Sequence, residues 1–286
     1  MVIKIWGCRG SIPAPGPYTF RYGGNTTCIE IRPAQGKALF IIDAGSGVRS
    51  LGKALIHESA VFEIRFLFTH AHWDHLMGFP FFQPAYSDRY TITLCSGIHA
   101  QGAIAQLVSH QMTAPYFPVD FRQLKATFNF RCENPTGELD CCLVSGIKCI
   151  PFPSNHPNGG QGFKFAENGK TFVFLTDNEL DFRHPGGLKR EQYVEICRGA
   201  DLLVHDAQYT DEEYRHTRGW GHSTFENAVN LAVEAGVKVL GLYHHDPDRT
   251  DDDQDRQLDH CRNYIQLAGS PVECFACAEG MVIELN

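Results

Sequence analysis

The chain has 286 residues, and 43% of them are hydrophobic and 12% aromatic, which is enough to bury the core of a large folded domain and excludes a disordered chain. The formal net charge is −8 and lysine and arginine are scattered along the sequence, so no general nucleic-acid-binding surface is expected. No apolar run approaches the roughly 20 residues of a membrane span, so a membrane protein is not expected either.

Strands and helices are expected to alternate along the first half of the chain. Alternating apolar residues predict strands at residues 3–6, 26–32, 37–45 and 62–68. Apolar residues at helical spacing predict a helix over residues 46–58 and another over residues 97–112. The segment after the second helix is too rich in proline to continue it.

The second half continues the alternation. Asn168-Gly169 is a strong turn signal and predicts a hairpin over residues 162–177. Ser223 and Glu226 have the spacing of a capping box, and Gly236 marks the exit of the helix that they would begin. The remaining patterns predict strands at residues 201–207 and 237–245, an exposed helix at 249–269 and a terminal hairpin at 271–285.

This alternation predicts an α/β fold in which two mostly β layers have helices outside them. No repeat or linker is apparent, so a single domain over residues 1–286 is expected. Within it, residues from about 84 to 130 are expected to form an insertion that is a candidate lid.

The cysteines point to a reducing compartment. Their number, 11, is odd, several fall within expected strands, and the N-terminal residues have the pattern of a strand rather than of a signal peptide. Reduced thiols and a cytoplasmic location are therefore expected. Cys274 and Cys277 form a lone CxxC pair, which is a weak indication of a redox or zinc site.

Ionisable residues collect at the C-terminal ends of the expected strands, where the loops of an α/β sheet build a site. One such histidine alone would be read as an ordinary core or surface residue, but a whole set left unpaired would be costly. Nitrogen and oxygen ligands without cysteine suit two divalent transition-metal ions, with zinc preferred and manganese or iron as alternatives. The set is Asp43, His70, His72, Asp74, His75, His156, Asp177, His205, Asp206, His244 and His245.

The segment THAHWDH, residues 69–75, resembles the HxHxDH signature of the metallo-β-lactamase superfamily, and FIIDAG resembles the strand before it there. The resemblance extends over nearly the whole chain and implies a four-layer αββα sandwich with the site at one edge. It implies that the first ion is held by His70, His72 and His156. It implies that the second is held by Asp74, His75 and a late histidine, and that Asp177 bridges the two.

The late histidine is His244 or His245, because LYHH offers both. The resemblance favours His244, and its strand neighbour would point the other way. Asp43 is expected to support the metal ligands from outside their shell.

The segments LVHDAQY, GHST and LYHH resemble the phosphodiesterase branch of the superfamily, which includes the tRNA 3′-processing endonuclease with its HEAT, HST and LTH segments. This resemblance implies that His222 is catalytic and that Asp206 orients it, and Asp74 is assigned to the catalytic group with them. The endonuclease carries a long arm for tRNA between the segments that match His156 and Asp177, where this chain has little more than a hairpin. The endonuclease also has glutamate at the position that matches Asp206 here.

These departures favour a phosphodiesterase that acts on a small anionic phosphodiester, such as a cyclic nucleotide or cyclic phosphate, by attack of a metal-bridging hydroxide. The alternatives are a tRNA 3′-end endonuclease, a thioester or lactone hydrolase of the same fold, and a metal-dependent sensor without catalysis. Tyr116 and Phe117 are candidates for covering the substrate, although they could equally pack the insertion. A homodimer is left open.

Overall fold

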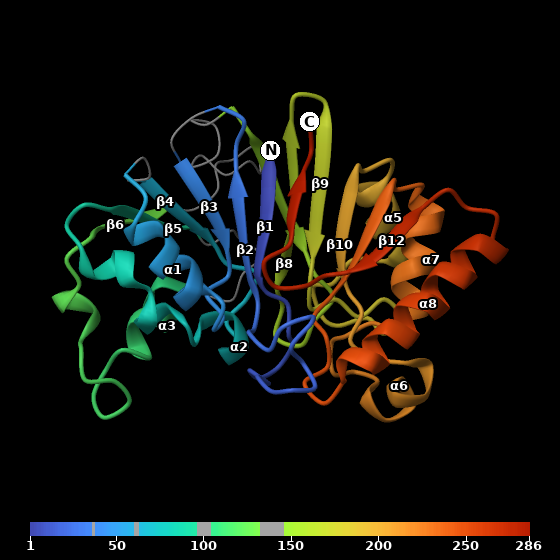
Figure 1. Cartoon of the computed structure of the whole chain (residues 1–286), viewed down its shortest axis with the longest axis horizontal. Coiled ribbons are helices and arrows are strands. Elements are labelled where there is room, and N and C mark those ends of the chain that lie inside the picture. The colour runs from blue at the N-terminus through green and yellow to red at the C-terminus, as the bar shows by residue number, and fades with distance from the viewer. Residues whose placement is uncertain (36–37, 60–62, 96–103, 132–145) are drawn as a thin grey trace.

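The computed structural model describes residues 1–35, 38–59, 63–95, 104–131 and 146–286. Two β-sheets lie face to face, with helices against the outer face of each (Figure 1). This arrangement confirms the predicted α/β fold and its αββα layers. No helix in the described part of the chain is both long enough and apolar enough to cross a membrane.

The first sheet has the strand order β13-β1-β2-β3-β4-β5-β6. Strands β3 to β6 run parallel to one another, whereas β13, β1 and β2 pair antiparallel. The bounds are Val2–Gly7 for β1, Cys28–Arg32 for β2, Ala38–Ile42 for β3, Glu63–Leu67 for β4, Thr91–Cys95 for β5, Thr127–Arg131 for β6 and Val282–Glu284 for β13.

The second sheet has the strand order β12-β11-β10-β9-β8-β7. Strands β9 to β12 are parallel, and β7 and β8 complete the sheet by antiparallel pairing, so β7 runs in the same direction as β9. The bounds are Lys148–Pro153 for β7, Gln161–Glu167 for β8, Lys170–Leu175 for β9, Leu202–Asp206 for β10, Val239–Tyr243 for β11 and Glu273–Ala276 for β12.

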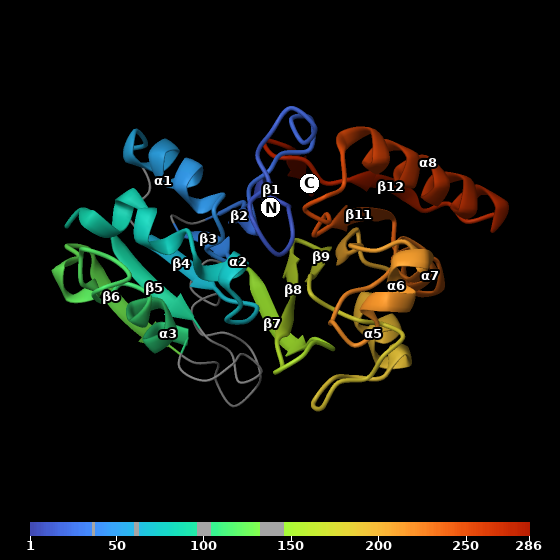
Figure 2. The same ribbon diagram turned by 90° about the horizontal axis from the view of Figure 1, so that it is seen from below.

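The helices divide between the two outer faces. Helices α1 (Val48–Ile56) and α3 (Ile104–His110) lie beside the first sheet, and α5 (Arg190–Cys197), α7 (Phe225–Ala235) and α8 (Asp251–Leu267) lie beside the second (Figure 2). Short helices α2 (Trp73–Leu76) and α6 (Asp211–Thr217) sit in loops, and 3-10 turns occur at Phe79–Phe81, Gln83–Tyr86 and Phe121–Gln123.

Both faces of the central strands are buried, which is why these strands read as continuous apolar runs. Along β9, Phe172 and Phe174 enter the core between the sheets, while Val173 and Leu175 enter the core beneath the helices. Along β3 the same alternation places Phe40 in the core between the sheets and the residues on either side of it in the core beneath the helices. Side chains on the inner faces of the two sheets pack against one another, and this core fixes the sheets relative to each other.

Two local predictions at the helix and strand level are wrong. Helix α7 begins at Thr224, whose hydroxyl accepts from the amide of Asn227, rather than at Ser223 with Glu226 as the capping box. The Ser223 hydroxyl is instead used outside the helix, where it donates to the Asn178 carbonyl. Gly236 does end the helix in a left-handed conformation, as predicted.

The predicted terminal hairpin does not form. Strand β12 pairs parallel with β11 in the second sheet, whereas β13 pairs antiparallel with β1 in the first. The alternation of apolar residues fixed which side chains are buried, but it carried no information about the partner strand. Cys274 and Cys277 on this segment are buried free thiols.

Of the predicted helix over residues 97–112, the structure describes Ile104–His110 as helical, and residues 96–103 lie outside the described part of the chain. The candidate lid, residues 84 to 130, includes β5 and most of β6, which continue the first sheet. Its action as a lid and the single-domain assignment stay predictions.

Candidate metal centre

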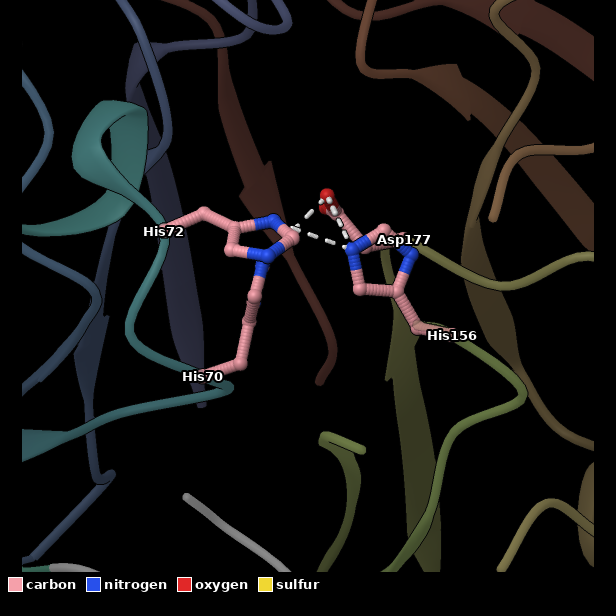
Figure 3. Close-up of side chains that lie close together, drawn as sticks. All are labelled: His70, His72, His156 and Asp177. Atoms are coloured by element: carbon pink, nitrogen blue, oxygen red, sulfur yellow. Dashed lines mark hydrogen bonds and ion pairs between the residues drawn. The ribbon is translucent and has the colours of Figure 1, made fainter. Parts of the chain in front are cut away.

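The C-terminal ends of β3, β4, β7, β9, β10 and β11 meet at one edge of the sandwich, because these strands run in the same direction within their sheets. Ionisable side chains at and after these ends form three overlapping groups, each with its ligand atoms within 4.8 Å of one another. Two of them share Asp177, and the third consists of Asp206, His222 and His244. The first group is His70, His72, His156 and Asp177 (Figure 3), and the second is Asp74, His75, Asp177 and His244.

Asp177 belongs to both groups because its two carboxylate oxygens face different histidines. Oδ2 lies 3.6 Å from Nε2 of His70 and 3.8 Å from Nε2 of His156. Oδ1 lies 3.2 Å from Nε2 of His75 and 3.3 Å from Nε2 of His244. A carboxylate in this position can serve two cations at once.

Asp74 belongs to the second group alone. Its Oδ2 lies 3.2 Å from Nε2 of both His75 and His244, and it accepts a hydrogen bond of 2.9 Å from the amide of Ser11. The N-terminal loop that carries Ser11 therefore holds a side chain 63 residues further along the chain.

The outer ring nitrogen of four of these histidines is engaged, which leaves Nε2 of each directed to the centre. Such partners select the tautomer and fix the orientation of a metal-binding imidazole. The contacts of Nδ1 are 3.0 Å to Thr69 Oγ1 for His70, 2.8 Å to Asp43 Oδ2 for His75, 2.9 Å to Gly221 O for His156 and 3.0 Å to Gln208 Oε1 for His244.

Asp43 lies behind the centre. It is fully buried and accepts 2.7 Å hydrogen bonds from both the amide and the hydroxyl of Thr69, besides the bond from His75. One carboxylate thus orients ligands of both groups, since Thr69 in turn contacts His70.

The donor atoms fit divalent cations. Nε2 of His70 and of His75 is buried without a hydrogen-bond partner, a costly state for a polar atom unless another group is bound there. Nε2 of His156 lies 3.1 Å from Nδ1 of His72, so two nitrogens converge on the same space. Burial lowers the pKa of His70 and His72, and lowers that of His156 to about 3, which keeps these imidazoles neutral as ligands must be.

The charge balance also favours cations. Burial opposes protonation of His75, but the carboxylates of Asp177, Asp74 and Asp43 raise its pKa well above the usual value. Burial likewise opposes ionisation of Asp177, yet the surrounding histidines hold its pKa well below its usual range. Among the described residues, Asp43, Asp74 and Asp177 are paired with histidine and not with lysine or arginine, and bound metal would neutralise their negative charge.

Left-handed backbone turns aim the site residues. Asp43, Asp177 and His244 have φ angles of 60°, 49° and 60°, a region that residues other than glycine rarely adopt. Each such residue costs on the order of 1–3 kcal/mol and persists where the surrounding structure enforces it. Gly10 allows the close approach of His244, because a Cβ at Gly10 would lie 2.4 Å from Nδ1 of that ring.

The hydrogen-bonded side chains of His222 and Asp206 lie beside this centre. Nδ1 of His222 is 2.6 Å from Oδ2 of Asp206, and the His222 ring stacks on His244 with centroids 4.8 Å apart and lies 5.2 Å from the His156 ring. Burial would lower the pKa of His222, but the charge and hydrogen bond of Asp206 raise it to about 9. The backbone amide of Gln208 donates a 3.1 Å hydrogen bond to Oδ1, the other oxygen of Asp206.

The structure separates the two late histidines. Nε2 of His245 donates a 2.7 Å hydrogen bond to the Cys277 carbonyl and the ring packs against Tyr22, so it faces the core and not the cluster. Phe117 packs its ring against Phe81, and Tyr116 is 74% exposed. Neither aromatic is among the clustered residues, so their role at the substrate stays a prediction.

Four supporting residues were not anticipated from the sequence. Gln208 and Gly221 stand within quoted motifs, next to Asp206 and His222, so a signal for them was present. Thr69 likewise opens the quoted motif of residues 69–75, so of the four only Ser11 had no signal in the sequence.

Two tryptophans border the cluster. Trp73 stands between two candidate ligands and is 81% exposed, and Trp220 stands two residues before His222 and is 62% exposed. Exposed aromatic side chains beside a reactive centre are available to contact a ligand.

Comparison with known proteins agrees with this geometry. The beta-lactamase superfamily domain matches residues 40–245. A protein named Ribonuclease Z from Brevibacillus brevis is 27% identical over an alignment of 278 positions that covers 82% of this chain and 84% of that protein. Two solved structures show the same fold. The metallo-beta-lactamase fold protein YhfI from Bacillus subtilis has a TM-score of 0.69 at 16% identity, covering 99% of both chains. A diphosphatase from the PhnP family has a TM-score of 0.69 at 18% identity, covering 100% of this chain and 98% of its own.

Metal content tests the shared role of Asp177. Elemental analysis of the purified protein should approach two divalent ions per chain. Asp177→Ala should lose both ions because its oxygens face both groups, whereas Asp74→Ala should lose only one. Full occupancy in Asp177→Ala would remove this residue from the centre.

The two late histidines should differ in metal affinity. His244→Ala should weaken the second ion by more than the roughly 10- to 100-fold that is typical of losing a residue outside the ligand shell. His245→Ala should leave that affinity near wild type and act on thermal stability instead. Chelator competition at a temperature where both variants are folded measures this, and the reverse order would mean that His245 is the ligand.

Proposed function

Since the chain belongs to the metallo-β-lactamase superfamily and is a metal-dependent hydrolase related to ribonuclease Z, we propose that it is a phosphodiesterase with two metal ions and a small phosphodiester as substrate. Cyclic nucleotides and cyclic phosphates are the favoured substrate class. The ions would be held by the two groups that share Asp177, with zinc preferred and manganese or iron as alternatives.

The observation that carries the proposal is the pair of His222 and Asp206 beside the metal ligands. Hydrolysis of a phosphodiester expels an alkoxide, which is a strong base and needs a proton. A thioester expels a thiolate, which is a weaker base and has less need of such a donor, whereas a lactone also expels an alkoxide. The pair therefore favours phosphodiester chemistry over thioester hydrolysis.

The roles of the side chains follow from their contacts. Bound divalent cations supply Lewis acidity at the phosphoryl oxygens and a nucleophile from water near neutral pH. Asp206 binds Nδ1 of His222 and fixes the tautomer, which leaves Nε2 to donate to the phosphodiester. Asp74 belongs to the second group and would hold the second ion. It would contribute to catalysis through that ion.

The size of the substrate is argued from the connection between two ligands. Between His156 and Asp177 the chain forms only the antiparallel pair β8 and β9, joined at Asn168-Gly169. No arm for tRNA is present in this fully described segment. Trp73 and Trp220 offer aromatic surface for the remainder of the substrate, and stacking on aromatic side chains suits a nucleobase.

The second candidate is an RNA endonuclease that cleaves at the 3′ end of tRNA, because curated relatives across the chain are named Ribonuclease Z. That activity would need RNA to be recognised by another surface or by a partner. The net charge of −8 offers no general attraction to RNA.

Substrate class is tested by a direct comparison of activities. The metal-loaded protein should hydrolyse bis(p-nitrophenyl) phosphate well above the metal-free rate, should have little activity on a β-lactam and should leave precursor tRNA intact at the same concentration. Efficient cleavage of precursor tRNA at one site would overturn the small-substrate proposal in favour of the endonuclease.

The leaving group tests His222. A nitrophenolate departs without much protonation, whereas a ribose alkoxide needs a proton, and general acid catalysis contributes roughly 10²–10⁴-fold where it is needed. His222→Ala should therefore keep its metal ions but lose far more activity on a nucleoside phosphodiester than on the nitrophenyl ester. Asp206→Ala should show the same bias more weakly.

The control is His260→Ala, which removes an exposed histidine on α8 that contacts Glu226. It should leave both activities unchanged. Equal losses on the two substrates in His222→Ala would mean that His222 only stabilises charge on the phosphoryl oxygens. No loss on either would remove it from the reaction.

A further inference from the structure

Glu179, two residues after the shared ligand Asp177, is a fully buried carboxylate that no step above uses. Its oxygens accept four hydrogen bonds, which occupy about all the lone-pair directions that a carboxylate has. Oε1 accepts from the Tyr214 hydroxyl at 2.6 Å and from the Gly219 amide at 2.6 Å. Oε2 accepts from Nε2 of His184 at 2.8 Å and from the Gly221 amide at 2.7 Å.

Three of these donors belong to one stretch of chain. Tyr214, Gly219 and Gly221 lie between the start of α6 and the start of α7, in the segment that leads into His222. Glu179 itself is fixed from the other side, since its amide donates a 2.9 Å hydrogen bond to the Asn155 carbonyl. Glu179 therefore joins three loops: its carboxylate binds the segment that precedes His222, and its backbone amide binds the segment that precedes His156.

Gly221 transmits this contact to a metal ligand. Its amide donates to Glu179, and its carbonyl accepts from Nδ1 of His156 at 2.9 Å. Its φ angle is +98°, and a Cβ there would lie 2.0 Å from Nδ1 of His156, so the peptide fits closely against the imidazole. The position of Gly221, whose two backbone polar groups make these contacts, therefore sets both the hydrogen bond and the space that His156 has.

Only a carboxylate can occupy this place. One backbone amide faces Oε1 and another faces Oε2, so the side chain must accept on both sides. The amide of glutamine would present its NH₂ group to one of the two N–H donors in either orientation. Glu179→Gln therefore changes almost no volume yet leaves one loop amide, Gly219 or Gly221, without an acceptor.

We propose that Glu179 is a positioning residue that orients His156 through the Gly221 peptide and so tunes the affinity of the first metal ion. Partners outside the ligand shell typically change metal affinity by roughly 10- to 100-fold when they are removed. Glu179 acts one step further out than Gly221, and it acts on one ion only, because its contacts reach His156 and none of Asp74, His75 and His244. The inference rests on the proposed metal centre but not on the identity of the substrate.

The test measures the two zinc affinities of the full chain by chelator competition. In Glu179→Gln the ion held with His156 should bind roughly 10- to 100-fold more weakly, and the other ion should keep its wild-type affinity. Reference variants His156→Ala and His244→Ala identify which binding step belongs to which ion. The matched control is Tyr214→Phe, which removes one donor to Glu179 but leaves both backbone amides with their acceptor, and should keep both affinities.

Two results would overturn the proposal. Wild-type affinity for both ions in Glu179→Gln would make Glu179 a residue of loop stability alone, and equal weakening of both would indicate general loosening of the site. If Glu179→Gln does not fold, amide hydrogen exchange of the wild-type protein replaces it. Coupling is reciprocal, so zinc should slow exchange at Gly221, and exchange unchanged by zinc would contradict the proposal.

The affinities need no substrate, so their outcome is independent of the activity assays. An inactive wild-type protein whose first ion is still weakened in Glu179→Gln would refute the phosphodiesterase proposal and leave this inference standing.

Discussion

The position of one carboxylate, Asp177, is the constraint on which the centre depends. Its two oxygens face histidines that come from different sheets, His70 and His75 after β4 and His156 and His244 after β7 and β11. Those histidines can meet at Asp177 only if both sheets end at the same edge and the packing between the sheets holds them in one relative position. The core between the sheets, with Phe40 on one side and Phe174 on the other, therefore determines the metal centre as much as the ligands do.

A second requirement is that the buried imidazoles present Nε2 to the centre beside the carboxylates. The structure meets it with partners behind the ligands: Asp43 behind His75, Gln208 behind His244 and the Gly221 carbonyl behind His156. These groups fix each ring before any metal arrives. The left-handed turns at the strand ends serve the same purpose, because they direct side chains across the edge instead of along the strand.

The sequence was informative about the layers and about which ionisable residues cluster, for a physical reason. Buried strands must be apolar, so a polar group directly after one, such as Asp43 or Asp177, stands out, and the spacing within residues 69–75 is local. Partner choice over long distances leaves no such trace. Ser11 reaches Asp74 across 63 residues, and β12 and β13 join different sheets although their sequence alternates like a hairpin. The start of α7 at Thr224 was missed by one residue because Ser223 could cap a helix equally well until its hydroxyl was used by Asn178.

A superfamily motif does not name a reaction, because the first half of the chain carries the motif and the second half carries other side chains at the same site. Residues 70–75 supply four of the candidate ligands, whereas the side chains proposed to act on the substrate lie at the end of β10 and in the loops after it. In this chain His222 and Asp206 lie beside the centre, and Glu179 is linked to the candidate ligand His156 through the backbone of Gly221. The segment that makes these contacts leads directly into His222, so one loop holds both the proposed proton donor and the support of a candidate ligand.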